Sequence, residues 1–181
     1  MDFMVKAAAV AMKQVPDANA SWMTTFVRQY EQVDINLIMG AGDSIAAPVI
    51  RDVGATGLHA ISSQIAEYEE GLFGGGGGGE GSASTSRDTV VQALQIGTFS
   101  IHNLGMYGVK SAAPVIMTPQ ACALSLGSVV DTVVPNGKDW KVAPIMTATL
   151  SCDHRVIDGA VGATWLQAFK TVVENPVAML V

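Results

Sequence analysis

The segment Leu150-Ser-Cys-Asp-His-Arg-Val-Ile-Asp-Gly159 decides the fold, because an apolar strand ends inside it and a helix begins directly after it. Residues 140–151 are rich in apolar and β-branched side chains, which favours a strand. Loops at the ends of rigid strands often carry functional groups, so the polar residues between this strand and the helix are the first candidates for a site. The helix is predicted over residues 160–173, with an inward face formed by Val161, Trp165, Ala168, Phe169 and Val172.

Outward from this segment, the pattern predicts one α/β domain with a mixed sheet and helices packed on it. Asp2 can cap a helix over residues 3–14, which Pro16 stops, and apolar side chains at helical spacing predict a second helix over 56–70. Further strands are expected over residues 33–38, 45–50, 98–103, 113–117, 121–126 and 129–134. A length of 181 residues suffices for one domain with a buried core.

The composition is poor in charge and rich in apolar side chains. Only 14% of the residues are charged, against about 25% in ordinary soluble domains, and 49% are apolar, so we expect surface to be buried in an oligomer. High hydrophobicity argues against disorder, and a net charge of −6 argues against nucleic acid as a partner. The apolar runs end well short of the ~20 residues of a membrane span, and the N-terminus lacks a signal-peptide pattern, so no membrane is expected either.

Residues 71–86 form a low-complexity insertion, rich first in glycine and then in serine. Eight of the nineteen glycines of the chain lie between Gly71 and Gly81. Such a segment has few side chains to bury, and we expect it to be flexible. A phosphate-binding loop is disfavoured, because Glu80 interrupts the run and no Lys-Ser/Thr pair follows the glycines.

Two cysteines, Cys122 and Cys152, lie inside apolar runs. Two cysteines could form one disulfide, but buried free thiols in a reducing compartment are favoured. Cys152, His154 and Asp158 are close enough in sequence to suggest a metal site. A zinc site usually combines three or four ligands with repeated spacing, and no second pair exists, so no metal is expected.

His154 is the sharpest candidate for chemistry among the three histidines. A histidine near neutral pKa can accept a proton, and Asp158, four residues later, could orient its imidazole. The alternative is structural, with Asp158 capping the following helix and Asp153 pairing with Arg155. Spacing alone favours the structural interpretation.

The other two histidines carry weaker signals. His59 falls on the predicted helix 56–70 and is interpreted as a surface or half-buried residue without a function. Thr98, Ser100 and His102 share one face of a predicted strand, because side chains alternate along a strand. That face either meets solvent or lines a cavity, and the pattern does not decide between them.

Three segments together resemble one family. Leu150-Ser-Cys-Asp-His-Arg-Val-Ile-Asp-Gly159 resembles the His-Arg-x-x-x-Asp-Gly signature of the dihydrolipoamide acyltransferases, the E2 core enzymes of 2-oxo acid dehydrogenase complexes. Gly97-Thr-Phe-Ser-Ile-His-Asn-Leu-Gly-Met-Tyr-Gly108 and Pro119-Gln-Ala-Cys-Ala-Leu-Ser-Leu-Gly127 are similar to two further family segments. The resemblance covers nearly the whole chain except the insertion, and its details are most similar to the acetyltransferases of pyruvate dehydrogenase complexes.

The resemblance implies an activity and a set of site residues. The family moves an acyl group between the thiol of a dihydrolipoyl arm and the thiol of coenzyme A, and the lipoyl group would come from a domain absent from this chain. His154 matches the family's general base and Asp158 its second motif residue. The oxyanion donor of the family is Ser or Thr, and His102 occupies that position here. Loss of such a donor typically slows a reaction ~10²–10³-fold, so the substitution matters.

The resemblance also implies an assembly. The family has a chloramphenicol acetyltransferase-like fold and forms homotrimers, in which the base of one subunit meets the oxyanion donor of the next, so His154 and His102 need not meet within one chain. Trimers build cubic or dodecahedral cores, and the apolar end, residues 177–181, resembles the docking tail between trimers. The implied partners are lipoyl domains and the E1 and E3 components, in the mitochondrial matrix or, in a bacterium, the cytoplasm.

Three features of the chain keep other functions open. Residues 1–181 correspond to the E2 catalytic domain but are N-terminally short, because family domains begin with a helix and a strand upstream of Asp2. Together with His102 and the insertion, this favours the alternative of a scaffold-type core subunit with weak or no acyltransferase activity. A free-standing antibiotic-modifying acyltransferase is a third candidate, which would lack the Asn-Leu-Gly-Met-Tyr-Gly detail.

Overall fold

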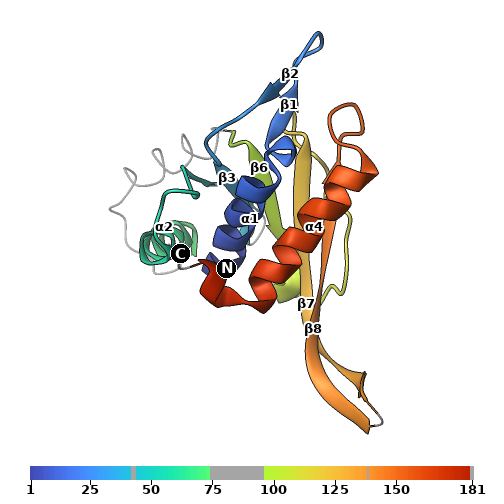
Figure 1. Cartoon of the computed structure of the whole chain (residues 1–181). Coiled ribbons are helices and arrows are strands. Elements are labelled where there is room, and N and C mark those ends of the chain that lie inside the picture. Colours follow the sequence, from blue (N-terminus) through green and yellow to red (C-terminus); the bar gives the residue numbers. More distant parts are fainter. Residues whose placement is uncertain (42–43, 74–95, 138, 180–181) are drawn as a thin grey trace, which may run out of the picture.

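The computed structural model describes residues 1–41, 44–73, 96–137 and 139–179, and shows a mixed sheet with helices on one face (Figure 1). The strand order is β4-β3-β6-β7-β8, with β5 also paired to β3. The strands β3, β6 and β7 are mutually parallel, and β4, β5 and β8 pair antiparallel with their neighbours. The bounds are β3 Ile35–Ala41, β4 Ser44–Ala46, β5 Val49–Ile50, β6 Phe99–Asn103, β7 Cys122–Asn136 and β8 Asp139–Cys152.

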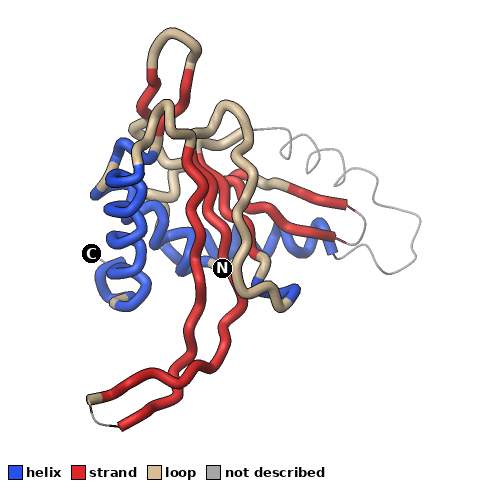
Figure 2. The backbone as a smooth tube through the Cα atoms, turned by 90° about the vertical axis from the view of Figure 1, so that its right-hand side faces the viewer, coloured by secondary structure: helices blue, strands red, loops and turns tan. Residues whose placement is uncertain are grey.

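The helices α1 (Asp2–Gln14), α2 (Leu58–Phe73) and α4 (Gly159–Glu174) pack on one face of this sheet, and the long connection after β6 runs along the other face (Figure 2). All three helices confirm the sequence prediction, except that Asp2 does not cap α1: it is the first helical residue, and the N-cap is Met1, which makes no side-chain cap hydrogen bond. The helix α2 continues to Phe73, three residues into the expected insertion, and the remainder of that insertion lies outside the described residues.

The core lies between the sheet and the helices. Its central side chain is Trp165 of α4, fully buried, with ring centroids 5.3 Å from Phe99 of β6 and 5.4 Å from Phe169. Around it lie the alternating apolar residues of the strands and the small inward residues of α1, and these contacts fix the start of α4 against β8. Buried members include Val5, Ala8, Met12, Ile35, Leu37, Ile101, Leu124 and Ile157.

Three strand predictions need correction. The expected strand 45–50 is two short strands, β4 and β5, because Pro48 between them has no N–H for the ladder. The expected strand 113–117 is an unpaired connection; Pro114 interrupts its donors, and the segment crosses over the sheet instead of joining it. The strands expected over 121–126 and 129–134 are one strand, β7, with a register shift between Leu126 and Val129.

Gly127 explains how β7 stays continuous at this shift. The Lys110 backbone carbonyl passes so close that a Cβ at position 127 would lie 2.0 Å from its oxygen. Ser128 N donates to Val109 O at 2.8 Å, so the crossing connection is pinned at the irregularity. Only glycine permits this approach.

Several short elements were not predicted, among them a hairpin and a C-terminal turn. A small antiparallel hairpin, β1 (Ala20–Trp22) and β2 (Val27–Gln29), follows the 3₁₀ turn η1 (Pro16–Ala18) and projects from one end of the sheet. The 3₁₀ turn η4 (Pro176–Met179) folds the C-terminal segment back, so that Met179 is buried in this chain's own core while Val177 stays 66% exposed. Residues 180–181 of the expected docking tail lie outside the described residues.

Because Trp165 is the largest fully buried side chain, Trp165→Ala is expected to lower the free energy of unfolding by about 3–5 kcal/mol, as lost burial and a cavity add. Chemical denaturation monitored by circular dichroism measures this. Phe26→Ala, which truncates an aromatic ring 52% exposed, is the matched control and should change stability by less than about 1 kcal/mol. Equal losses in the two variants would contradict the packing described here.

Candidate active site

His154 lies in the turn between β8 and α4, at residues 153–156. The turn is held at its base by Asp153 N, which donates to Ala121 O at 2.8 Å, and by Val156 N and Ile157 N, which both donate to Asp153 O at 3.0 Å. Ile157 is buried in the core, whereas the His154 side chain is exposed. An exposed imidazole therefore stands on a backbone that the core fixes.

Arg155 and Asp153 brace the turn on either side of His154. The guanidinium donates to the Asp153 carboxylate from Nε (3.0 Å) and from Nη2 (2.6 Å), and Arg155 N donates to Oδ1 at 3.1 Å. These hydrogen bonds lower the pKa of Asp153, so the pair stays ionised. The guanidinium also lies 5.6 Å from the Trp22 ring centroid, which ties the turn to the hairpin β1–β2. The expected charge pair is confirmed.

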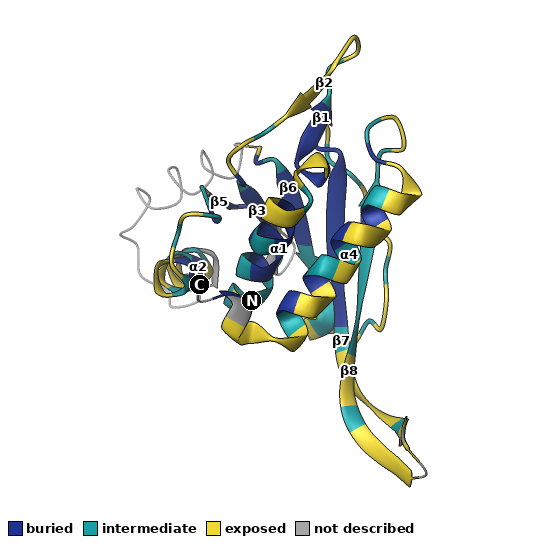
Figure 3. Cartoon of the chain, viewed as in Figure 1, coloured by how far each residue is buried: buried dark blue, intermediate teal, exposed yellow. Residues whose placement is uncertain are grey.

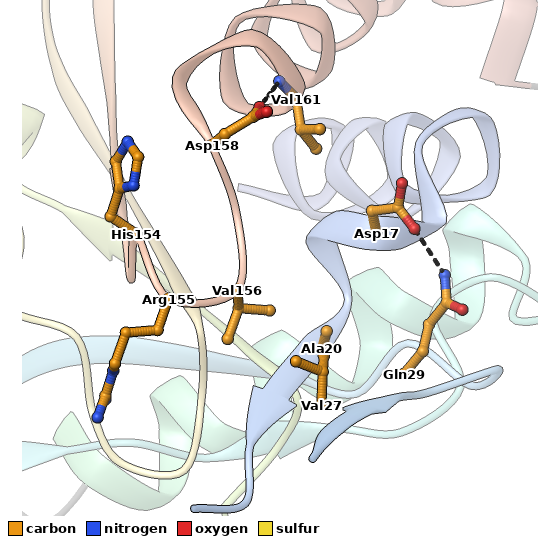
Figure 4. A pocket seen from close by; sticks show the side chains of 9 residues that line it. All are labelled: Asp17, Ala20, Val27, Gln29, His154, Arg155, Val156, Asp158 and Val161. Atoms are coloured by element: carbon orange, nitrogen blue, oxygen red, sulfur yellow. Dashed lines mark hydrogen bonds between the residues drawn. The ribbon is translucent and has the colours of Figure 1, made fainter. Parts of the chain in front are cut away.

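Asp158 caps α4. Its Oδ1 accepts a hydrogen bond from Val161 N at 2.8 Å, and Figure 4 shows the carboxylate turned toward the helix rather than toward His154. Within the described residues, no hydrogen bond joins Asp158 to His154. The capping interpretation is therefore confirmed, and Asp158 acts on the turn by fixing where the helix begins.

His154 and Arg155 line two pockets. One has a volume of about 370 Å³ and lies between the turn, the start of α4 and the hairpin β1–β2, with Asp17, Gln29 and Val161 in its wall (Figure 4). The other, of about 380 Å³, lies toward the crossing connection and includes Trp22, Gln120 and Cys152. Both fall in the range of small-molecule sites, so the imidazole is accessible from two spaces.

His102 lies elsewhere on the sheet. In register it pairs with Ser125 of β7, which pairs with Thr149 of β8, five residues before His154. At ~3.3 Å per residue this is roughly 16 Å along the strands, with two strand spacings, roughly 10 Å, across the sheet. One chain therefore does not bring His102 and His154 together.

The face that carries His102 is an interior surface rather than a solvent face. Ser100 is fully buried, and Ser125 Oγ donates to Ala112 O of the crossing connection at 2.6 Å. His102 is half-buried; its Nε2 is shielded from solvent and has no hydrogen-bond partner among the described residues. Burial lowers the pKa of His102, so its imidazole is neutral at pH 7 and carries one N–H donor.

Three residues that line the two pockets, Trp22, Gln29 and Gln120, were not predicted from the sequence. Trp22 and Gln29 come from a hairpin whose strands are too short to show a periodic signal. Gln120 lines the second pocket and is held in place by two hydrogen bonds: its Nε2 donates to Asn36 Oδ1 at 2.9 Å and to Gly97 O at 3.0 Å. The signal that could have found it is its place in the Pro119-Gln-Ala-Cys segment. His59, predicted as a surface or half-buried residue, is exposed on α2.

The described part of the chain contains no group of three or more His, Cys, Asp or Glu side chains placed to hold a metal ion. Among the same residues, no helix is both long and apolar enough to cross a membrane.

The fold is that of chloramphenicol acetyltransferase, to which the chain is similar with a TM-score of 0.51 at 10% identity, over 94% of this chain and 75% of that one. More specifically, residues 1–181 match the family described as 2-oxoacid dehydrogenases acyltransferase (catalytic domain), and the chain belongs to this family. The resemblance stated from the sequence is confirmed, as is the expected fold class.

Relatives come from eukaryotes and bacteria. The dihydrolipoyllysine-residue acetyltransferase component of the mitochondrial pyruvate dehydrogenase complex of Schizosaccharomyces pombe is 41% identical over 182 residues, 99% of this chain and 35% of that protein. The corresponding component of Rickettsia prowazekii is 36% identical over 180 residues, 99% of this chain and 41% of that protein. The chain thus spans well under half the length of these two relatives.

Two solved structures share this fold. A probable dihydrolipoamide acetyltransferase from Listeria monocytogenes has a TM-score of 0.81 at 28% identity, over 96% of this chain and 69% of that one. The cubic core of a pyruvate dehydrogenase multienzyme complex has a TM-score of 0.85 at 25% identity, over 99% and 70%.

The environment of His102 predicts a pH dependence. Because burial lowers its pKa, the unfolded chain binds more protons than the native chain below the ordinary histidine pKa of about 6.5. The free energy of unfolding should therefore fall as the pH falls from about 6.5, by up to about 1.4 kcal/mol per pH unit. Denaturant titrations of His102→Gln should show a flatter slope in this window, whereas His59→Gln should retain it. An unchanged slope in His102→Gln would refute the assignment.

Proposed function

We propose that this chain catalyses acetyl transfer between the thiol of a dihydrolipoyl group and the thiol of coenzyme A, and forms part of the structural core of a pyruvate dehydrogenase complex. The observation that carries the proposal is the exposed imidazole of His154, held on a rigid turn and shared by two pockets. Two pockets at one base suit a reaction in which two thiols exchange one acyl group. The relatives named above support the same activity.

In the proposed mechanism, His154 removes the proton of the attacking thiol, which is a poor nucleophile near its ordinary pKa of ~8.5. The thiolate attacks the thioester carbonyl and forms a tetrahedral intermediate with a negatively charged oxygen. This intermediate collapses, the second sulfur leaves with its bonding electrons, and the imidazolium of His154 returns the proton to it. The acyl group has then moved from one sulfur to the other.

In the same proposal, His102 of a neighbouring copy donates a hydrogen bond to the oxyanion. Its neutral imidazole keeps one N–H for this purpose, and within a single chain it lies too far from His154 to act. Asp158 and the pair Asp153–Arg155 are positioning residues, because they fix the helix start and the turn that carry the base. The site is thus completed by assembly.

The end of the β7–β8 pair is the surface we propose for that assembly. Figure 3 shows the pair extending beyond the body of the domain as an exposed arm. Its large apolar side chains are exposed, Trp140 most of all at 73%. Such a patch is typical of a buried interface rather than of a free surface. The exposed apolar residues of this arm are Val129, Val130, Val133, Trp140, Val142 and Ile145.

We further propose a homotrimer as the unit that builds a cubic or dodecahedral core, with lipoyl domains and the E1 and E3 components as partners. The cubic-core structure that shares this fold supports the core role. The lipoyl group would arrive on a separate domain. In a eukaryote the proposed location is the mitochondrial matrix, and the fission yeast relative is named as mitochondrial. In a bacterium the proposed location is the cytoplasm.

The catalytic proposal predicts that His154→Ala lowers the rate of acetyl transfer from acetyl-coenzyme A to dihydrolipoamide by about 10²–10⁴-fold, the usual contribution of a general base. His59→Ala is the matched control and should retain the wild-type rate, because His59 is exposed on α2. Equal rates for wild type and His154→Ala would refute the role of His154. An assembled but inactive wild-type protein would support the scaffold-type alternative instead.

The assembly proposal predicts that Trp140→Asp, which places a charge in the apolar arm, lowers the sedimenting mass of the protein. Lys141→Ala is the control, because it changes the next residue of the same strand without placing a charge among the apolar side chains of the arm. Analytical ultracentrifugation of both variants measures the outcome. A Trp140→Asp variant with the mass of the wild type would show that the arm does not form the interface.

A further inference from the structure

Cys122 and Cys152 face each other across the first pair of the β7–β8 ladder. They are direct partners in the antiparallel register, and both are free thiols. Their Sγ atoms lie 3.3 Å apart, with Cys122 donating the S–H hydrogen bond. The mechanism proposed above uses neither thiol, although Cys152 lies two residues before His154.

The two thiols differ in access. Cys122 is fully buried in the core, whereas Cys152 is partly exposed and belongs to the lining of the pocket that includes Trp22 and His154. A small reagent can therefore reach Cys152 first, with Cys122 behind it.

The two thiols also differ in acidity. The hydrogen bond from Cys122 lowers the pKa of Cys152, and the same hydrogen bond together with burial raises the pKa of Cys122. A thiol of lowered pKa that is accessible, next to a second thiol within contact distance, is the arrangement of an attacking and a resolving cysteine.

We propose that Cys122 and Cys152 form a dithiol modification site, which a small hydroperoxide closes into an intramolecular disulfide. The Cys152 sulfur attacks the terminal peroxide oxygen and the O–O bond breaks; the remainder leaves with the electron pair, takes up a proton and becomes water or an alcohol. Cys152 is then a sulfenic acid. The Cys122 sulfur displaces its hydroxyl group, the Cys122 proton joins that hydroxyl as water, and the S–S bond forms. The two thiols lose two electrons and one peroxide is reduced.

The backbone already permits this bond. Directly opposed residues of antiparallel strands have Cα atoms about 4.5–5.5 Å apart, within the roughly 4.4–6.8 Å that disulfides span. From 3.3 Å the sulfur atoms need to approach by about 1.2 Å to reach a bond of about 2.05 Å. Side-chain rotation with small backbone adjustment suffices, so closure needs no unfolding.

The experiment treats the whole assembled chain with hydrogen peroxide, blocks remaining thiols with iodoacetamide and maps the peptides without reduction. The expected product is one cross-linked peptide joining Cys122 to Cys152, lighter than the sum of its parts by two hydrogen atoms and separated again by dithiothreitol. Cross-links between chains, or a wild type in which Cys152 instead passes to sulfinic acid, would overturn the proposal. This readout does not depend on acyl transfer.

Cys122→Ser is the matched variant, because it removes the resolving thiol and keeps the attacking one. It should lose the cross-link and accumulate a Cys152 sulfenic acid that dimedone traps. Without peroxide, iodoacetamide should modify Cys152 of the native wild type at least about tenfold faster than Cys122. Equal rates for the two cysteines would contradict the assigned roles, and this measurement holds even if Cys122→Ser does not fold.

Discussion

The pairing of β7 with β8 is the interaction on which the rest of the molecule depends. The ladder runs from Cys122 opposite Cys152 to Asn136 opposite Asp139, longer than any other pairing in the described residues. One end passes directly into the turn that carries His154, and the other end is the exposed apolar arm. One continuous pair of strands therefore links the candidate site to the surface proposed for assembly.

The β7–β8 pair also holds the crossing connection in place, through the close approach of the Lys110 carbonyl to Gly127. The connection that crosses there covers the polar face of the sheet, where Ser125 donates to its backbone and where the ring of His102 is desolvated. Without the crossing, this face would meet water and the imidazole would titrate like an ordinary histidine. The lowered pKa of His102 thus depends on the connection that follows its own strand and covers this face.

The sequence reveals those features that repeat locally. The helical spacing of Val161, Trp165 and Phe169 predicts α4, and the Asp153–Arg155 pair and the cap by Asp158 follow from spacing within one turn. Strand pairing is different, because it depends on contacts far apart in the chain. The segment around Val115 has strand-like residues, yet it crosses the sheet, and the hairpin that carries Trp22 is too short to show a pattern. The proposed role of His102 rests on family resemblance, since alternation alone could not tell an interior face from a solvent face.

The separation of His102 from His154 along the register has a consequence for kinetics. Under the proposed assignment, each chain carries halves of two different sites, which the strand register keeps apart within one chain. Turnover per chain would then rise with protein concentration at high dilution and become constant once assembly is complete. A newly synthesised chain would therefore transfer no acetyl groups until it had assembled with neighbouring copies.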